Sequence, residues 1–163
     1  MFNYKTKPYA HQEEALLRSF NRKNYAYFME MGTGKTKTAI DNIGYLYLRK
    51  EIDTVLIIAP KSVYTIWSKE IQAHLPDVVG RDIFQWKLDK PKSWNFFLKS
   101  KKLKIFLMNV EALSGKNGYK EAESFLKKFP KNFAVIDEST TIKNPKAKRT
   151  KYILSLSKHI KFR

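Results

Sequence analysis

Short apolar runs alternate with amphipathic stretches along this chain. Three runs are apolar almost throughout and rich in β-branched or aromatic residues, at 54–59, 104–110 and 133–137. Runs of this kind predict strands that are buried on both faces, as in a parallel sheet. Two further segments, 24–29 and 78–85, are shorter or more polar strand candidates. The pattern therefore predicts a sheet whose strands come from the whole length of the chain.

Apolar residues at helical spacing fill the intervals between these runs. They predict helices over 8–23, 35–50, 62–73, 119–129 and 145–158. Strands that alternate with helices imply right-handed crossovers and helices on both faces of a parallel sheet. We therefore predict an α/β fold with three layers and a mostly parallel central sheet, in one domain that spans residues 1–163.

A glycine-rich loop, Met31-Gly32-Thr33-Gly34-Lys35-Thr36, lies between a predicted strand and a predicted helix. Its glycines let the backbone of Gly32, Thr33 and Gly34 turn tightly and point N–H groups at one anion, where the helix N-terminus adds partial positive charge. Lys35 can then reach the β- and γ-phosphates of a nucleotide, and the Thr36 hydroxyl can ligate Mg²⁺. The strict pattern has glycine where Met29 stands, so this loop is a variant. The alternative is a flexible turn before a lysine, but the strand–loop–helix setting favours phosphate binding.

Two adjacent carboxylates, Asp137 and Glu138, follow the apolar run at 133–136. Ligands of an open parallel sheet bind beyond the carboxyl ends of its strands, so this pair is expected to face the glycine loop. Asp137 would hold Mg²⁺ and Glu138 would polarise the attacking water in phosphoryl transfer. An ordinary acidic turn is the alternative, and the glycine loop upstream favours the catalytic interpretation.

The charge balance is strongly positive, with 32 Lys and Arg residues against 15 Asp and Glu residues and a formal net charge of +17. A polyanionic partner explains this balance through salt-sensitive phosphate contacts, and a merely solvated lysine-rich surface is the alternative. No apolar run approaches the roughly 20 residues of a membrane span. With no cysteine present, a disulfide framework and a thiolate site are excluded. We expect a cytoplasmic protein without a membrane partner, of phage or bacterial origin, and in the host cytoplasm if phage-encoded.

Other side chains carry weaker signals. Trp86, Trp94, Phe96 and Phe97 are interleaved with lysines in the segment 86–102 and could stack on bases, but core packing explains them better. The three histidines have no metal-ligand spacing and are expected at the surface or in packing; they are His11, His74 and His159. The basic residues between 143 and 151 form either a solvated face or a phosphate-contacting face, and the sequence leaves both open.

Five segments resemble, in order and spacing, the motifs of superfamily-two helicases, especially the Swi/Snf-type double-stranded DNA translocases. They are Pro8-Tyr9-Ala10-His11-Gln12, Met29-Glu30-Met31-Gly32-Thr33-Gly34-Lys35-Thr36, Ile57-Ile58-Ala59-Pro60-Lys61-Ser62 followed by Trp67, Asn109-Val110-Glu111-Ala112-Leu113, and the segment 136–146 around Asp137 and Glu138. Two positions depart from the family pattern, because Met29 replaces an acid and Thr140 stands where the group has histidine. The resemblance covers nearly the whole chain.

The resemblance implies a RecA-like ATP-binding lobe that uses ATP and Mg²⁺. It assigns Gln12 to the adenine edge, and Lys61, Ser62 and Asn109 to the backbone of a nucleic acid, most simply double-stranded DNA. The family continues past the position of Arg163 into a second RecA-like lobe with an arginine finger, which would be supplied in cis or in trans. We therefore expect a fragment or the front part of a split motor, with weak or no hydrolysis by this lobe alone.

The leading prediction is the ATP-binding lobe of an ATP-dependent DNA helicase or translocase. Two alternatives stay open: a phosphate-loop ATPase that acts on a protein partner, and a nucleic-acid-binding module with a vestigial nucleotide site. The sequence does not distinguish a DNA track from an RNA track.

Overall fold

A four-stranded parallel sheet forms the centre of the computed structural model, which describes residues 3–89, 91–138 and 142–163. The strands are β1 (Thr54–Ala59), β2 (Arg81–Gln85), β3 (Leu103–Asn109) and β4 (Asn132–Ile136), in the order β2-β3-β1-β4. In β1 the side chains of Val55 and Ile57 enter one core cluster, and those of Leu56 and Ile58 enter another. The central strand is thus buried on both faces, which explains its continuous apolar run.

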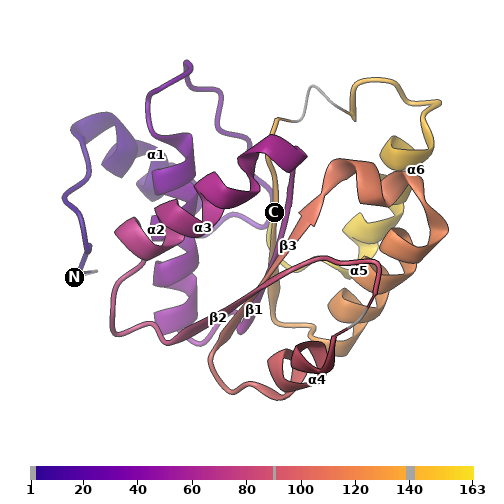
Figure 1. Ribbon diagram of the computed structural model, residues 1–163. Coiled ribbons are helices and arrows are strands. Elements are labelled where there is room, and N and C mark those ends of the chain that lie inside the picture. The colour runs from indigo at the N-terminus through magenta and orange to yellow at the C-terminus, as the bar shows by residue number, and fades with distance from the viewer. Residues whose placement is uncertain (1–2, 90, 139–141) are drawn as a thin grey trace.

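Helices cover both faces of the sheet (Figure 1). On one side lie α1 (Ala10–Ser19), α2 (Lys35–Leu48) and α3 (Tyr64–His74), and on the other lie α4 (Lys92–Lys99), α5 (Lys116–Lys128) and α6 (Lys148–Leu156). Short 3-10 helices follow β1, β3 and α6, at Lys61–Val63 (η1), Val110–Ser114 (η2) and Ser157–His159 (η4). The predicted three-layer α/β architecture is confirmed.

The strand predicted at 24–29 is wrong. In the described part of the chain, this segment is joined to the sheet by backbone bonds with Arg163, whose N–H donates to Lys23 and whose carbonyl accepts from Tyr25, at 2.8 and 2.7 Å. Residue 162 in turn pairs with β4 through a single parallel bridge between Phe133 and Phe162. Two backbone bonds to a single residue do not make a strand, so the segment 24–29 has no regular secondary structure and contacts the sheet only through residues 162 and 163.

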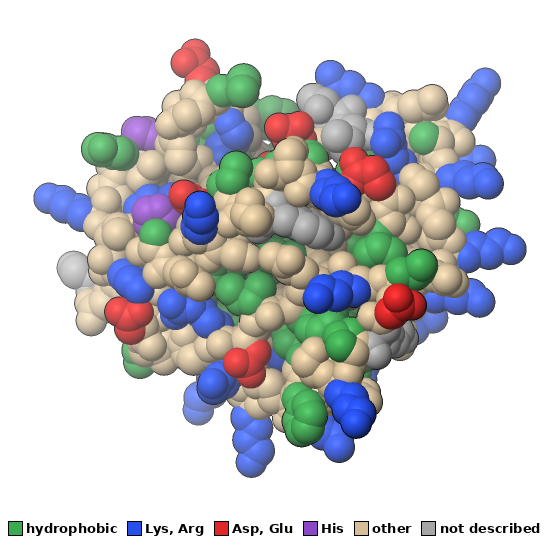
Figure 2. Space-filling view, viewed as in Figure 1, with side chains coloured by type: hydrophobic (Ala, Val, Ile, Leu, Met, Phe, Trp, Pro, Cys, Tyr) green, Lys and Arg blue, Asp and Glu red, His purple; other side chains and the backbone are tan. Residues whose placement is uncertain are grey.

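Lysine and arginine side chains project all round the face of the molecule seen in Figure 2, with acidic side chains scattered between them. Several lysines are exposed on opposite edges of the sheet. Lys61 follows the carboxyl end of β1, whereas Lys50 and Lys131 precede the amino ends of β1 and β4. The positive charge therefore does not by itself mark one surface.

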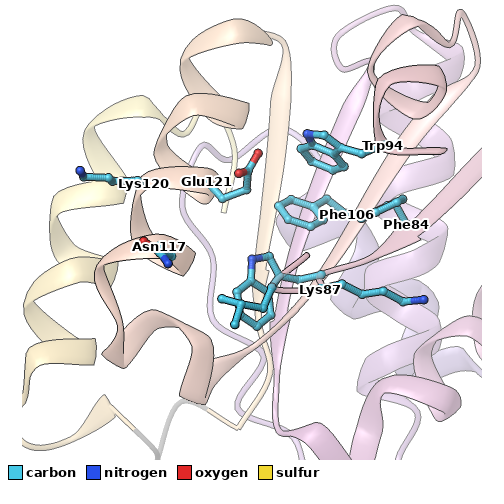
Figure 3. Close-up of a pocket in the computed structure, with 9 residues that line it drawn as sticks. Phe84, Lys87, Trp94, Phe106, Asn117, Lys120 and Glu121 are labelled. Carbon is cyan, nitrogen blue, oxygen red and sulfur yellow. The ribbon is translucent and has the colours of Figure 1, made fainter. Parts of the chain in front are cut away.

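Helix α4 is an element that the sequence did not predict. It is amphipathic and buries Trp94 and Phe97, which confirms core packing for these two rings, while Phe96 stays 76% exposed. Trp86 is half-buried and lines a cavity of about 340 Å³ between the segment after β2 and the first turns of α5 (Figure 3). Trp94 and Phe106 form part of its wall, and the Glu121 carboxylate points toward them from α5.

Candidate nucleotide site

The glycine loop lies at the sheet edge where the strands end. Because α2 runs antiparallel to β1, its first residues lie at the edge formed by the carboxyl ends of the strands (Figure 1). Gly32 and Gly34 have φ angles of +78° and +85°, a left-handed conformation that costs glycine little. Gly34 is the N-cap of α2 and offers no side chain to its N–H groups. The first N–H groups of this 14-residue helix therefore lack an intrahelical partner and can bind an anion.

Lys35 turns back over the loop that it follows. Its Nζ donates to the carbonyl oxygens of Met29 and Glu30, at 2.9 and 2.8 Å. The Thr33 hydroxyl donates to the same Glu30 carbonyl at 2.7 Å, which closes the loop. The ammonium group is thus held beside the uncapped end of α2, together with the half-buried Thr36. An ammonium group and free N–H donors around one turn fit a phosphate chain.

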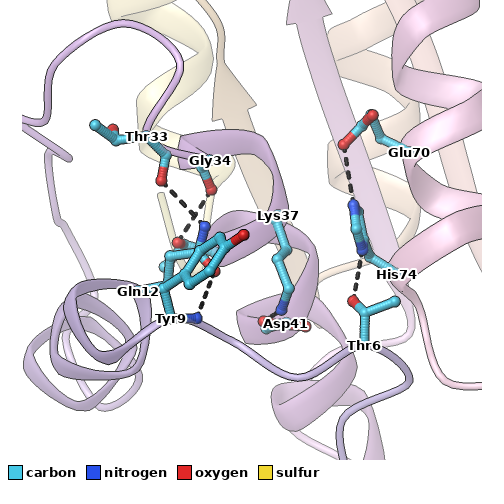
Figure 4. Close-up of polar contacts among 10 residues, drawn as sticks. Thr6, Tyr9, Gln12, Thr33, Gly34, Lys37, Asp41, Glu70 and His74 are labelled. Carbon is cyan, nitrogen blue, oxygen red and sulfur yellow. Dashed lines mark hydrogen bonds and ion pairs between the residues drawn. The ribbon is translucent and has the colours of Figure 1, made fainter.

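Helix α1 contacts the glycine loop through Gln12. Gln12 is only 4% exposed, accepts the Tyr9 N–H at its Oε1 (3.0 Å) and donates from Nε2 to the Thr33 carbonyl (3.1 Å), as Figure 4 shows. A Cβ atom on Gly34 would lie 2.2 Å from this Nε2 and would push the Gln12 amide away from the loop, and the φ angle of +85° favours glycine as well. Both polar atoms of the Gln12 amide thus bond backbone in this structure, and its role in reading adenine stays a prediction.

His11 is exposed, as expected for a surface histidine, but its contact with the glycine loop was not predicted from the sequence. Its Nε2 lies 2.9 Å from the Thr33 carbonyl, and its ring stacks on Tyr9 with centroids 5.9 Å apart. A lone histidine in an amphipathic helix gives no signal for such a contact. Together Gln12 and His11 fix the carbonyl of the central loop residue from one side.

The segment before α1, residues 3–9, contacts α2 and α3. Thr6 Oγ1 lies 2.6 Å from Nδ1 of His74, whose Nε2 pairs with Glu70 at 3.2 Å (Figure 4). The Tyr4 ring lies 5.5 Å from the ammonium of Lys37, which pairs with Asp41 inside α2 at 2.6 Å. Burial raises the pKa of the Asp41 carboxyl, and the Lys37 ammonium opposes that rise. These contacts tie the segment to α2 and α3.

The carboxylate pair follows β4 at the same edge of the sheet. The Asp137 N–H continues the ladder by donating to Ile58 at 2.8 Å. Its Oδ2 accepts the indole N–H of Trp67 at 2.9 Å, and its Oδ1 accepts the N–H of Glu138 at 2.9 Å. Glu138 is exposed, with φ at +50°. A left-handed conformation at a residue other than glycine is uncommon and clusters at functional sites.

The chemistry of the donors suits a magnesium ion that a nucleotide brings with it. Among the described residues, no group of three or more His, Asp or Glu side chains is placed to hold a metal. Mg²⁺ is normally held by one or two protein ligands plus phosphates and water, so a hydroxyl and one carboxylate are enough. Thr36 and Asp137 are such a pair, and their metal role stays a prediction.

The three residues expected at a nucleic acid also lie at this edge. Lys61 and Ser62 are exposed in η1, directly after β1. Asn109 ends β3 opposite Ala59 of β1, and its Oδ1 accepts the Ala112 N–H at 3.0 Å. This bond caps η2, so part of the Asn109 side chain has a local structural role. Thr140, the departure from the histidine pattern, lies outside the described residues.

Comparison with known proteins identifies the family and the fold of this chain. The family model of the SNF2-related domain matches residues 16–162, and the chain therefore belongs to that family. The SWI2/SNF2 ATPase core of Sulfolobus solfataricus, solved in complex with double-stranded DNA, has the same fold. It superposes with a TM-score of 0.69 at 23% identity, over 99% of this chain and 31% of that chain.

Two curated relatives are chromatin-remodelling ATPases. The ISWI chromatin-remodeling complex ATPase ISW1 of Saccharomyces cerevisiae is 34% identical over 145 residues, which cover 87% of this chain and 12% of the yeast protein. A probable chromatin-remodeling complex ATPase chain of Oryza sativa is 33% identical over 116 residues, which cover 71% of this chain and 10% of the rice protein. The chain thus spans a small part of the length of these relatives. A phage or bacterial origin stays a prediction.

Separately, none of the described helices is long and apolar enough to cross a membrane.

Proposed function

We propose that this chain is the ATP-binding lobe of an ATP-dependent DNA translocase. The observation that carries the proposal is the glycine loop at the uncapped start of α2, with Lys35 folded over it and Asp137 and Glu138 at the same sheet edge. Membership of the SNF2-related family supports a motor over other phosphate-loop ATPases.

Each site residue has a defined part in this proposal. The backbone of residues 32–34 cradles the phosphates and Lys35 neutralises the β- and γ-phosphates. Thr36 and Asp137 hold Mg²⁺, which supplies charge stabilisation at the transferred phosphoryl group. Glu138 orients and activates the attacking water, and its exposure leaves it accessible to that water. Gln12 favours adenine from its place under the loop.

Hydrolysis requires a second RecA-like lobe, in cis or in trans. An arginine finger is worth about 10³ to 10⁵ in rate, and a cleft between two lobes is where such a residue approaches the γ-phosphate. This lobe therefore binds nucleotide and hydrolyses it weakly on its own. Nucleic acid, and double-stranded DNA in particular, is the proposed track, supported by the net charge of +17 and by the exposed Lys61 and Ser62.

The test combines nucleotide binding with hydrolysis. ATP affinity in Mg²⁺ is measured by calorimetry for the wild type, Lys35→Ala, and the control Lys101→Ala, an exposed lysine before β3. Loss of a charge-assisted bond to phosphate is expected to weaken binding by about 10- to 100-fold in Lys35→Ala and to leave the control unchanged. ATP hydrolysis in the presence of the second lobe is then measured with and without duplex DNA. Nucleotide binding without any stimulation by DNA would exclude the translocase and favour an ATPase with a protein partner.

A further inference from the structure

Trp67 makes a long-range contact with the carboxylate pair. It lies in α3 and is only 2% exposed, packed in the core cluster between the sheet and α2. A buried indole N–H needs an acceptor, and this one donates to Oδ2 of Asp137 at 2.9 Å, 70 residues away in sequence. Helix α3 is thereby joined directly to the residue expected to hold Mg²⁺.

The Asp137 carboxylate is oriented from both sides. Trp67 donates to Oδ2, the Glu138 N–H donates to Oδ1, and the Asp137 N–H is fixed to β1 through Ile58. Carboxylates that bind metals are commonly held by such outer hydrogen bonds, whose loss weakens metal affinity. Because the Glu138 donor is an adjacent backbone group, Trp67 is the one side chain among the described residues that hydrogen-bonds this carboxylate.

The same helix begins at the proposed DNA-contacting turn. The residues of η1, Lys61–Val63, lead directly into α3, and Trp67 follows four residues after Val63. Lys61 and Ser62 are exposed, whereas Trp67 one turn later is buried against the sheet. A phosphate backbone bound at Lys61 and Ser62 would therefore lie about one helical turn from the side chain that holds Asp137.

We propose that Trp67 is a positioning residue that holds Asp137 in its magnesium-binding orientation and links the turn Lys61–Val63 to that carboxylate. This inference rests on the proposed function, because it requires a Mg²⁺·nucleotide at the loop. It assigns to Trp67 a role that packing alone does not require, since a phenyl ring would fill most of the same space.

The test is Trp67→Phe, which keeps a buried aromatic ring and removes the N–H. Affinity for ADP is measured by calorimetry in Mg²⁺ and again in EDTA. Mg²⁺ is expected to strengthen ADP binding by the wild type. In Trp67→Phe this strengthening is expected to be about tenfold smaller, because a hydrogen bond to the Asp137 carboxylate is lost, while the affinity for ADP in EDTA stays unchanged. Duplex DNA is expected to strengthen Mg²⁺·ADP binding in the wild type, and this coupling is expected to fall in Trp67→Phe.

Trp94→Phe is the matched control, because Trp94 is 5% exposed and lies in the core cluster on the other face of the sheet. An equal loss in Mg²⁺ and in EDTA for Trp67→Phe, no loss in either, or the same effect in the control would each overturn the inference. Failure of the wild type to bind ADP in both buffers would instead reject the proposed function. If Trp67→Phe lowers the melting temperature strongly, benzothienylalanine at position 67 replaces it, because its sulfur removes the N–H and keeps the ring shape.

Discussion

Gly32 and Gly34 share a left-handed backbone but differ in what surrounds them. A Cβ on Gly32 meets nothing within 4 Å, whereas one on Gly34 would lie 2.2 Å from Nε2 of Gln12. Gly32→Ala is therefore expected to cost only the conformational strain of about 1 kcal/mol. Gly34→Ala adds displacement of the Gln12 amide, which bonds the Thr33 carbonyl of the loop, so the nucleotide affinity of Gly34→Ala should be lower than that of Gly32→Ala.

Affinity for ADP is measured by calorimetry, and stability by thermal melting, for Gly32→Ala and Gly34→Ala. Gln12→Ala combined with Gly34→Ala removes the steric clash, and it is expected to restore part of the stability but not the contact to Thr33. Equal losses of ADP affinity and of stability in Gly32→Ala and Gly34→Ala would show that the contact between Gln12 and Gly34 contributes to neither.

Lys104 is a buried cation in a strand, 5% exposed, with Nζ 3.0 Å from the Ser100 carbonyl and 4.8 Å from the Phe129 ring centre. Burial lowers its pKa below the usual lysine value, with Asp53 and Asp82 opposing the change. A lysine whose pKa is lowered in the folded state destabilises the protein while it is charged there. This cost is full below the folded-state pKa and disappears as pH rises from that value to the ordinary lysine pKa.

Lys104→Met is therefore expected to stabilise the fold by about 1 kcal/mol at pH 7. The difference from the wild type should shrink as pH rises from the lowered folded-state pKa of Lys104 toward the ordinary lysine pKa, because in this window the folded wild type releases the proton that the unfolded chain still keeps. Urea unfolding of both proteins at neutral and alkaline pH measures this difference. A difference in unfolding free energy between the two proteins that grows with pH would contradict a lowered pKa for Lys104.

The positions and contacts of individual residues were only partly predictable from sequence. The placement of Lys35 after the glycine loop and of Asp137 at a strand end follows from local motifs, because a strand–loop–helix turn and a strand end are short-range patterns. The bonds of Gln12 and His11 to Thr33, and of Trp67 to Asp137, join elements far apart in the chain. No local periodicity encodes such pairings, so they emerge only when the elements are packed.

At the scale of elements, Asn132 holds together the ends of three segments. Its Nδ2 donates to the carbonyls of Phe129 and His159 at 2.7 and 2.9 Å, and its Oδ1 accepts the Lys161 N–H at 2.9 Å. The side chain is fully buried at the start of β4. It thus provides hydrogen-bond partners for backbone groups at the end of α5, at the end of η4 and in the segment that pairs with β4.

Asn132→Ala is expected to cost about 3 kcal/mol, because buried backbone groups lose their partners. Asn144→Ala is the control, since exposed Asn144 makes only a local bond to the Lys146 N–H at 2.9 Å, and it should cost about 0.5 kcal/mol or less. Urea unfolding measures both. A smaller loss of unfolding free energy in Asn132→Ala than in Asn144→Ala would show that water replaces the hydrogen bonds of Asn132.

The elements themselves were predictable where burial was complete on both faces or where helical spacing was regular. The strands at 54–59 and 133–136 were found from their apolar runs. Helix α4 was not, since only Trp94 and Phe97 are buried among lysines in an eight-residue element. The segment 24–29 has strand-like composition, but it lacks an extended ladder partner among the described residues, which composition cannot reveal.

At the scale of the whole molecule, the alternation of elements determines where a polyanion can bind productively. The net charge of +17 attracts phosphates everywhere, but the parallel order of the strands gathers Lys61, Lys143 and Lys146 in the chain segments that follow the carboxyl ends of β1 and β4. Lys50, Lys101 and Lys131 precede the amino ends of β1, β3 and β4. All six are exposed, so two triple variants can remove equal charge from opposite edges.

Neutralising the first triple to Gln is expected to weaken duplex DNA binding and to lower the slope of log affinity against log salt by about 0.9 per lost phosphate contact. Neutralising the second triple is expected to leave that slope nearly unchanged, because only the long-range field is reduced and salt screens it beyond about 10 Å. Fluorescence anisotropy over a series of salt concentrations gives both slopes, and repeating it with duplex RNA compares the two tracks. Equal changes from the two triples would mean that the charge acts as a diffuse field rather than as a track at the nucleotide-binding edge.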